Sequence, residues 1–257
     1  MNDNLIFLTD EDLDKNVYRI FSFSRLQEFF QEQKLALVRP SLWEDPFENF
    51  ILNSTGTFPD GREFTIGNRD SFYGQCWSLT KESDAMWRIY SPDKDGVKVK
   101  TTLRKLFRPF FEYGGVHHKM NGNEYNLKTF IGKVKYKGKR ALINMLSDRD
   151  RMSGKLYDQS GWGQASTFYF KRWAFRHENE VRLMYNGNED PNANGNVFKF
   201  DINPNELIDE IVFDPRMEKT EYEIKKAETR DLGFDKRIIQ SGLYKIQEFR
   251  LLVNDLQ

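Results

Sequence analysis

Several features that define common protein classes are scarce in this 257-residue sequence. Cys76 is the only cysteine, so an internal disulfide and a thiolate metal cluster are excluded. Of the three histidines, His117 and His118 are adjacent and would diverge on a strand or helix, which argues against a shared metal ion. No apolar run approaches the ~20 residues that cross a bilayer, and the start lacks the pattern of a signal peptide. We therefore predict a cytoplasmic protein without a metal.

Three motifs of catalysis and nucleotide binding are also missing. There is no Gly-x-x-x-x-Gly-Lys-Ser/Thr loop and no Gly-x-Gly-x-x-Gly turn, which argues against P-loop and dinucleotide-fold binding. The Gly-x-Ser-x-Gly elbow of serine hydrolases is absent as well. Any chemistry must therefore come from another arrangement of side chains.

The sequence has no formal net charge at neutral pH, because its 39 basic residues balance 39 acidic ones. The distribution is uneven: residues 1–50 hold ten acids and five bases, whereas residues 98–155 hold fifteen bases and four acids. A basic segment attracts phosphates, although a solvated surface has the same composition. Aromatic residues make up 15% of the chain, which is typical of a globular protein and not of a disordered one.

Apolar and polar residues alternate in short stretches, as in half-buried strands. Strands are predicted at 17–23, 35–39, 73–80, 97–101, 131–139, 180–185, 196–201, 208–214, 238–246 and 249–253. Helices are predicted at 24–30, 84–90 and 217–231, and residues 139–176 have helical composition that is interrupted around 160–163. The two types do not alternate regularly, so we predict an α+β fold with a mixed, mostly antiparallel sheet and packed helices. Strands within 180–201 and within 238–253 are expected to form hairpins. The acidic residues 1–16 are predicted to form a tether before a single domain at 17–257.

The segment before Tyr185 carries the densest chemistry of the chain. Val181 and Leu183 should face the core of a strand, and Glu178, Glu180 and Arg182 should share its other face. Two carboxylates and a guanidinium on one face form either a solvated surface or the wall of a polar cleft.

These segments resemble a bacterial domain of unknown function, the two-nine-seven-one family. The resemblance spans roughly residues 17–250 and rests on Tyr18-Arg19, Glu44-Asp45-Pro46-Phe47-Glu48, Trp77-Ser78-Leu79-Thr80, Met86-Trp87-Arg88-Ile89-Tyr90, Asp95-Gly96, Arg172-Trp173 and Glu178-Asn179-Glu180-Val181-Arg182. It implies little about activity, because the family is largely uncharacterised.

A second resemblance concerns the order of side chains along the chain. An arginine on an early strand, Ser-x-Thr on a later one and then Glu-x-Glu is similar to ADP-ribosyltransferases of the Arg–Ser–Glu type. The resemblance implies an ADP-ribosyltransferase-like fold, NAD as substrate, and Glu180 and Glu178 as catalytic residues. The residues expected to hold the nucleotide are Arg19, Tyr18, Ser78, Thr80, Trp87 and Tyr90.

Cleavage of the nicotinamide–ribose bond of NAD builds positive charge on the sugar, which a carboxylate stabilises. Glu180 would steady that cation, and Glu178 would orient or deprotonate the acceptor. The alternative is an exposed charge pair with Arg182 or a neighbouring lysine, worth at most ~1 kcal/mol. For Arg19, the alternatives are binding of the pyrophosphate and a structural ion pair with Glu44, Asp45 or Glu48.

The remaining candidates also have a structural alternative. Ser78 would hydrogen-bond Glu180 or the ribose, or it is an ordinary strand serine. Trp77, Trp87 and Tyr90 would stack on a ring of the nucleotide, or they belong to the core.

We therefore predict an NAD-dependent ADP-ribosyltransferase-like enzyme or NAD glycohydrolase with a nucleic acid or a protein as acceptor, and a toxin or phage-defence effector is the role that we consider for it. A non-catalytic module that binds nucleic acid or nucleotide through the basic residues 98–155 is the alternative. A stress-related interaction module is a third reading. The acceptor and the oligomeric state do not follow from the sequence.

Overall fold

The computed structural model describes residues 1–43, 45, 54–65, 69–158, 160–188, 190–193, 195–246 and 250–252. Its helices are α1 (Phe23–Glu32), α2 (Asp84–Tyr90), α3 (Leu103–Tyr113), α4 (Lys139–Ser147), α5 (Arg149–Leu156), α6 (Trp162–Ser166), α7 (Pro204–Leu207) and α8 (Lys219–Asp231). Its strands are β1 (Leu5–Ile6), β2 (Asn16–Ser22), β3 (Lys34–Val38), β4 (Gly56–Thr57), β5 (Glu63–Phe64), β6 (Phe72–Ser78), β7 (Gly96–Thr102), β8 (His117–His118), β9 (Glu124–Tyr125), β10 (Thr129–Lys133), β11 (Lys135–Lys137), β12 (Phe170–Arg172), β13 (Glu180–Asn186), β14 (Val197–Asp201), β15 (Glu210–Phe213) and β16 (Arg237–Gln240).

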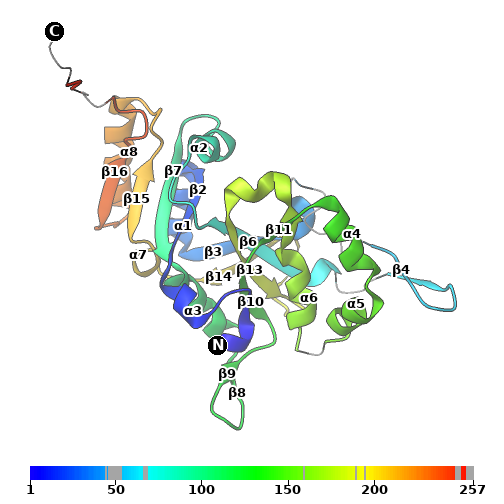
Figure 1. Cartoon of the computed structure of the whole chain (residues 1–257). Coiled ribbons are helices and arrows are strands. Elements are labelled where there is room, and N and C mark those ends of the chain that lie inside the picture. The colour runs from blue at the N-terminus through cyan, green and yellow to red at the C-terminus, as the bar shows by residue number, and fades with distance from the viewer. Residues whose placement is uncertain are drawn as a thin grey trace, which may run out of the picture.

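One 10-stranded sheet forms the centre of the molecule (Figure 1). Its main path runs in the order β1-β10-β13-β6-β2-β7-β15-β16. The pairs at the two ends, β1 with β10 and β15 with β16, are parallel, and the pairs between them are antiparallel. The predicted α+β fold with a mixed, mostly antiparallel sheet is therefore confirmed.

The sheet divides at β6. Near its end β6 pairs with β2 through Tyr18 and Ser78, and near its start it pairs with β3 through Val38 and Gly74. β3 in turn carries β14 as an antiparallel neighbour. Between these two pairing points the strands separate, so the sheet forms a fork with its vertex at Ser78.

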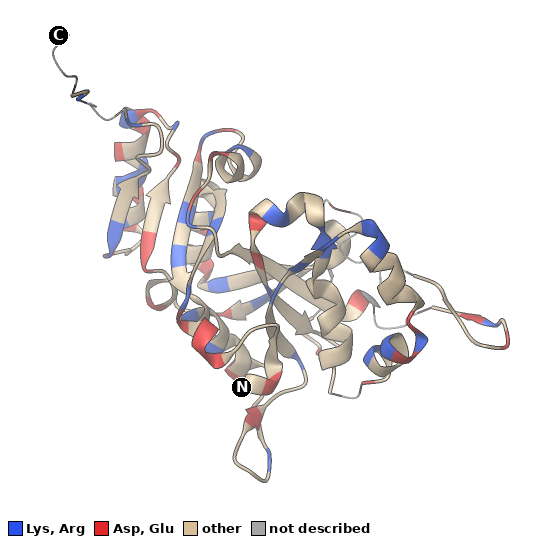
Figure 2. Ribbon diagram, viewed as in Figure 1, with Lys and Arg blue, Asp and Glu red and all other residues tan. Residues whose placement is uncertain are grey.

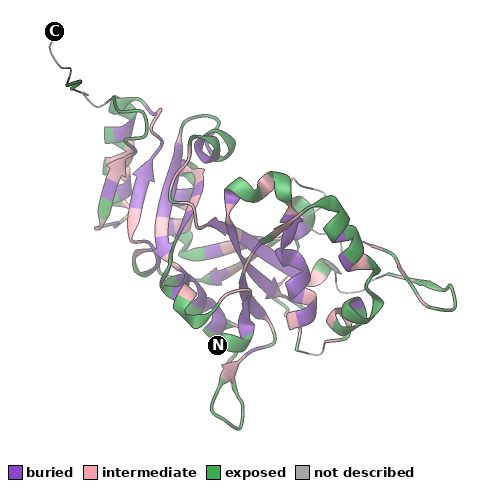
Figure 3. Ribbon diagram, viewed as in Figure 1, coloured by how far each residue is buried: buried purple, intermediate pink, exposed green. Residues whose placement is uncertain are grey.

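Helices cover both faces of the sheet, and the strands between them are buried (Figure 3). On one face Leu26 of α1, Phe107 of α3 and Tyr222 of α8 join the largest apolar cluster. On the other face Trp87 of α2 and Ala165 of α6 belong to separate, smaller clusters. The core is therefore continuous on one side and divided on the other.

The predicted α1 is present, with a different first residue. Leu26 and Phe30 of the apolar stripe are buried as expected. The helix begins at Phe23 with Ser22 as its N-cap, so the cap lies two residues before Ser24, which the pattern indicated.

Both hairpin predictions are wrong. The two edges of β13 are already occupied by β10 and β6, and the loop after β13 carries the chain to the other branch of the fork, where β14 pairs with β3. β16 is followed by a turn, and the described residues 241–246 and 250–252 contain no strand. The prediction for residues 247–249 and 253 lies outside the described residues.

The predicted long strand at 131–139 is divided in two. β10 ends at Lys133, and the amide of Val134 donates to the carbonyl of Glu180. β11 then pairs with β12 in a separate, two-stranded sheet. Alternation continues through Val134, but the chain changes partner there, which no pattern of residue types records.

The acidic N-terminal segment packs onto the sheet, unlike the tether that its composition suggested. Leu5 and Ile6 form β1 beside β10, and both are buried. Leu13 is fully buried in the main cluster. These apolar side chains, together with the buried hydrogen bonds of Asn4 to Asn126 and Thr129, attach the segment to the domain.

Candidate active site

The vertex of the fork aligns three predicted site residues in one row. Tyr18 of β2 pairs with Ser78 of β6, and Ser78 pairs with Glu180 of β13. Directly opposed residues of antiparallel strands point to the same face. Residues 18, 78 and 180 are therefore neighbours on the face that α2 covers.

The two glutamates lie in a buried cluster of four charges. Lys171 Nζ pairs with Glu178 Oε2 and lies 3.5 Å from Glu180 Oε1. Arg182 Nη2 lies 2.6 Å from Glu180 Oε2. Glu178 is 6% exposed, Glu180 5% and Arg182 0%. The solvated charge pair that the sequence left open is thus excluded in this structure.

Glu180 is held in its ionised form. Burial on its own raises the pKa of this carboxyl, but Arg182 and Lys171 outweigh burial and bring the pKa below its ordinary value. The backbone amide of Glu180 donates to the hydroxyl of Tyr136 at 2.9 Å. Burial, and next the charge of Glu180, raise the pKa of Tyr136, so its hydroxyl stays neutral.

Glu178 reaches this cluster by a different route from the predicted one. It ends a 3-10 helix over Trp173–Glu178, and Asn179 takes a left-handed conformation with φ of 46° before β13 begins. Glu178 therefore does not lie on the strand. Its backbone carbonyl accepts a hydrogen bond of 2.6 Å from the hydroxyl of Ser78, and its Oε1 lies 3.5 Å from the hydroxyl of Tyr90.

Ser78 and Thr80 shape the backbone beside the acids. The hydroxyl of Ser78 accepts from the amide of Thr80 at 3.0 Å while it donates to the carbonyl of Glu178. Ser78 is buried, so it acts here as a bridge between β6 and the turn that precedes β13.

Arg19 lies in a cavity of about 290 Å³ within the fork. Its guanidinium lies 5.5 Å from the ring of Phe21 and has no hydrogen bond or ion pair with any described residue. Burial, and next the charge of Arg25, lower the pKa of Arg19 to about 10, so the side chain stays charged at neutral pH. Of the ion-pair partners that the sequence left open for Arg19, Asp45 pairs with Arg172 instead, and Glu44 and Glu48 lie outside the described residues.

Two polar side chains in the wall of this cavity, Trp77 and Gln75, have hydrogen-bond partners. Trp77 donates to Gln75 Oε1 at 2.7 Å, and Gln75 donates to the carbonyl of Ala36 at 2.7 Å. The cavity lies on the α1 side of the sheet, since Arg25 and Phe29 of α1 line it. The predicted constellation is thus divided: Tyr18, Ser78, Glu178, Glu180 and Tyr90 lie together, and Arg19 faces the cavity on the opposite side of the sheet.

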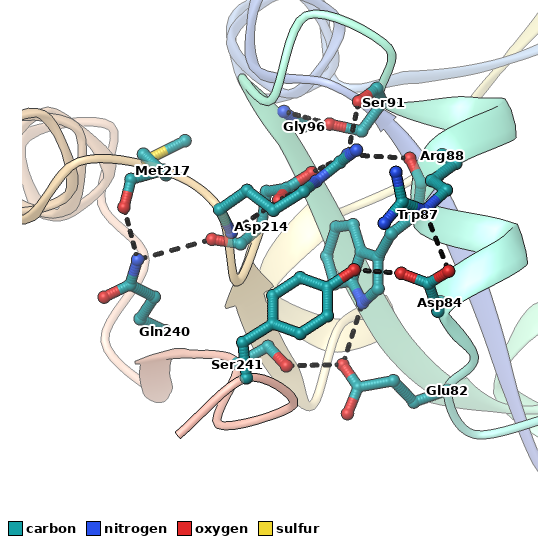
Figure 4. A network of polar contacts seen from close by, with 12 residues as sticks. Glu82, Asp84, Trp87, Arg88, Ser91, Gly96, Asp214, Met217, Gln240 and Ser241 are labelled. Carbon is teal, nitrogen blue, oxygen red and sulfur yellow. Dashed lines mark hydrogen bonds and ion pairs between the residues drawn. The ribbon is translucent and has the colours of Figure 1, made fainter. Parts of the chain in front are cut away.

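Trp87 is part of a polar network and not a free stacking surface (Figure 4). Its side chain is fully buried, and its indole N–H donates to Glu82 Oε1 at 2.9 Å. The same oxygen accepts from Lys98 at 2.9 Å and from Ser241 at 2.8 Å. Trp87 and Tyr18, which is also buried, therefore belong to the core, whereas Tyr90 remains 39% exposed.

This network fastens α2 to the end of the chain. Arg216 donates to the carbonyls of Trp87 and Ser91 at 3.0 and 2.6 Å, at the C-terminal end of α2. Tyr244 donates to Asp84, the first residue of α2. The position of Tyr90 above Glu178 thus depends on contacts from distant parts of the chain.

The sequence did not single out Lys171, Glu82 or Lys98. Lys171 precedes the acid pair by seven residues, and no periodicity relates it to either glutamate. Lys98 is 3% exposed, and a lysine within an apolar strand was the only signal that it carries a buried charge.

Among the residues that the structure describes, no group of three or more His, Cys, Asp or Glu side chains is arranged to hold a metal ion. The helices there are too short or too polar to cross a bilayer.

Known structures with some similarity come from the DarT protein of Thermus sp. 2.9. The complex with carba-NAD+ has 11% sequence identity and a TM-score of 0.38, and the match covers 89% of this chain and 96% of that chain. The complex with ADP-ribosylated ssDNA has 10% identity and a TM-score of 0.39, covering 89% and 94%. TM-scores below 0.5 do not establish a common fold. No curated protein sequence matches the chain.

Residues 86–183 match the family described as "Protein of unknown function (DUF2971)". This stretch contains the Met-Trp-x-x-Tyr helix of α2 and the Glu-x-Glu-x-Arg segment that leads into β13. The family resemblance that these motifs predicted is thereby confirmed over that stretch.

Proposed function

We propose that the protein is an NAD-dependent enzyme of the ADP-ribosyltransferase type. The row of Tyr18, Ser78 and Glu180 across three neighbouring strands carries this proposal. It joins an ionised carboxylate to residues from three distant parts of the chain, and the Arg19 cavity, whose cation has no ionic partner among the described residues, lies on the opposite face of the sheet. Such convergence is typical of an active site.

The chemistry assigns one role to each carboxylate. The bond between ribose C1′ and the nicotinamide nitrogen breaks, and its electron pair leaves with nicotinamide. Glu180, kept ionised by Arg182 and Lys171, stabilises the positive charge on the ribose. The acceptor then bonds to C1′ and loses its proton to Glu178. Water as acceptor gives NAD hydrolysis by the same steps.

Arg19 supplies a cation for the pyrophosphate, which requires the dinucleotide to pass between the separated strands of the fork, because the Arg19 cavity lies on the face of the sheet opposite to Glu180. A guanidinium binds phosphate through two parallel N–H···O bonds, and Arg19 has no competing carboxylate among the described residues. The cavity of about 290 Å³ is at the lower end of ligand pockets, so part of the dinucleotide would lie outside it. Since Glu178 and Glu180 are nearly covered, we expect Tyr90 to move away from Glu178 when the substrate enters.

Nicotinamide release from NAD labelled in the nicotinamide ring tests the proposal, with transfer to cell extract as a second readout. The Glu180→Gln variant should lower both by at least about 100-fold, the usual range for a catalytic carboxylate. Glu221→Gln is the matched control, because Glu221 is exposed on α8 and pairs with Lys225. If the wild-type protein releases no nicotinamide with either acceptor, the proposal fails.

The biological role is a separate part of the proposal. A toxin or phage-defence effector that consumes NAD would slow the growth of its host. Induced expression of the wild-type protein should therefore arrest growth, and Glu180→Gln should relieve the arrest. Equal growth of the two strains at equal protein levels would remove this role.

The basic segment supports a second function, the binding of a nucleic acid. Lys133, Lys135, Lys137, Lys139, Arg140, Arg149 and Arg151, which we call the basic strip, form no ion pair with any described residue. Many of the chain's other basic residues are paired, so the positive charge of the strip is uncompensated. Figure 2 shows this charge on β11, α4 and α5.

Salt dependence tests this second function. Binding of a single-stranded oligonucleotide to the strip should weaken steeply as salt rises, because phosphate contacts release counterions. Replacing Lys135, Lys137 and Lys139 by glutamine should make the binding constant depend less steeply on salt concentration. If the affinity does not change with salt concentration, the strip is excluded as the contact surface.

A further inference from the structure

A second hollow lies beside the basic strip, on the face opposite to the Arg19 cavity. It has a volume of about 360 Å³ and lies between the end of β1 and helices α5 and α6. Its lining residues are Phe7, Arg151, Gly154, Lys155, Asp158, Trp162 and Gly163. None of them belongs to the row at the vertex of the fork.

Two aromatic side chains form the apolar part of the hollow. Trp162 begins α6 and is partly accessible, and Phe7 follows β1. Phe7 has a φ of 58°, a conformation that costs energy for a residue with a side chain. Its ring packs against Phe170 at 5.6 Å between centroids. The strained backbone thus keeps an aromatic ring at the hollow, where a ligand ring can stack.

Two cations flank these rings. Lys155 Nζ lies 5.2 Å from the centroid of the Trp162 ring and donates to the hydroxyl of Ser166. Arg151 is exposed and forms no ion pair with a described residue. A ligand with both a planar ring and an anionic group therefore finds partners for each.

Asp158 is the acidic residue of the lining, and its oxygens already have donors. Oδ2 accepts from the amide of Gly163 at 2.7 Å, and both oxygens accept from the hydroxyl of Ser160. Asp158 thus fixes the turn into α6. The lining has two cations, Arg151 and Lys155, against this one carboxylate, so its net charge is positive.

We propose that this hollow binds a nucleotide, with its base against Trp162 and its phosphate near Arg151 and Lys155. Aromatic stacking combined with cations is how proteins bind bases without regard to sequence. The volume fits one ring system with its substituents better than a duplex. The site is separate from the Glu178–Glu180 pair and does not depend on NAD cleavage there.

Calorimetric titration with AMP and dTMP tests the proposal, since it measures binding and not turnover. Gly154→Leu places a side chain at the hollow. A Cβ added at Gly154 meets nothing within 4 Å, and leucine favours the helix over glycine, so the variant should fold. We expect Gly154→Leu and Trp162→Leu each to weaken nucleotide binding at least about 10-fold, as the loss of one stacked base implies.

The controls separate this site from the other two. Glu180→Gln should bind AMP as the wild type does even if NAD turnover is lost, and Arg140→Gln should weaken only a single-stranded oligonucleotide. If inorganic phosphate binds as tightly as AMP, the ring contributes nothing and the proposal is overturned. It is equally overturned if the oligonucleotide binds, no mononucleotide does, and Gly154→Leu has no effect on either.

Discussion

The guanidinium of Arg182 binds the carboxylate of Glu180, which lies two residues earlier on the same strand. Its Nη2 and Nε lie 2.6 and 3.2 Å from Glu180 Oε2, and its Nη1 donates to the carbonyl of Phe168 at 2.7 Å. The guanidinium also lies 4.5 Å from the ring of Trp43. The proposed catalytic acid therefore has a counterion that is itself held on three sides.

Replacing Arg182 by methionine should destabilise the protein by about 3–5 kcal/mol. The substitution leaves Glu180 buried with Lys171 as its remaining close cation, and breaking a buried pair costs this much. Urea unfolding measures the change. The double variant Glu180→Gln with Arg182→Met should recover part of the loss, because no uncompensated charge remains. A single variant as stable as the wild type would contradict the buried pair.

Stability should fall in acid, and Glu180 should account for part of that fall. Its pKa in the folded protein lies below the ordinary value of 4.5, despite burial, because Arg182 and Lys171 favour the charged form. A group with a lowered folded pKa adds stability above its unfolded pKa and loses it as pH falls through the folded value.

The free energy of unfolding should therefore drop between about pH 5 and pH 3. In Glu180→Gln the protein is less stable at neutral pH, but the drop should be shallower. Parallel slopes for the two proteins, measured by urea unfolding at each pH, would show that Glu180 does not contribute.

Removing the carboxylate of Glu82 should loosen α2. Its Oε1 accepts hydrogen bonds from Trp87, Lys98 and Ser241, so Glu82→Ala leaves a buried lysine and an indole N–H without that acceptor. We expect a loss of about 2–3 kcal/mol, the scale of bonds to a charged group.

Two variants serve as controls for Glu82→Ala. Glu82→Gln keeps an acceptor oxygen and should lose less, and Glu221→Ala, at an exposed helix pair, should change the free energy of unfolding by less than ~0.5 kcal/mol. If Glu82→Ala and Glu221→Ala have equal effects in thermal unfolding, the network in Figure 4 does not hold α2.

Arg19→Met should have opposite effects on stability and on activity. Methionine is close to arginine in the length of its apolar stem and removes a half-buried cation that has no ionic partner among the described residues, so stability should rise by about 1 kcal/mol. The affinity for NAD should fall, because the cation for the pyrophosphate is gone. A destabilised variant with unchanged NAD affinity would show that Arg19 is a structural residue.

Local sequence patterns predicted many of the strands and helices, but they did not predict that the sheet divides at β6. The strand at Tyr73–Thr80 and the helix after Ser83 were predicted closely, since Ser83 accepts from the amide of Met86 as an N-cap should. The fork at Ser78 and the pairing of β14 with β3 depend on which strand edges remain open, and residue types do not encode that.

The candidate site was predictable to the same extent. Alternation placed Glu180 and Arg182 on one face, and the structure pairs them. Alternation did not reveal that the 3-10 helix between Lys171 and Glu180 folds the chain back, so that Lys171 lies beside both glutamates. It also did not reveal that Trp87 donates a hydrogen bond to Glu82. These contacts arise from packing between elements. The Glu44–Glu48 box lies outside the described residues except for Asp45, which pairs with Arg172 at 2.8 Å.

The sheet ends on both sides in strands too short to recruit another chain. β1 is two residues long and β16 four, and both run parallel to their neighbours. The border of the branch is β14, where Lys199 forms ion pairs with Glu28 and Glu32 of α1. Short outer strands, and a charged lysine on the edge strand β14, disfavour edge-to-edge aggregation. A ten-stranded β-rich domain of this design should remain dispersed at high concentration.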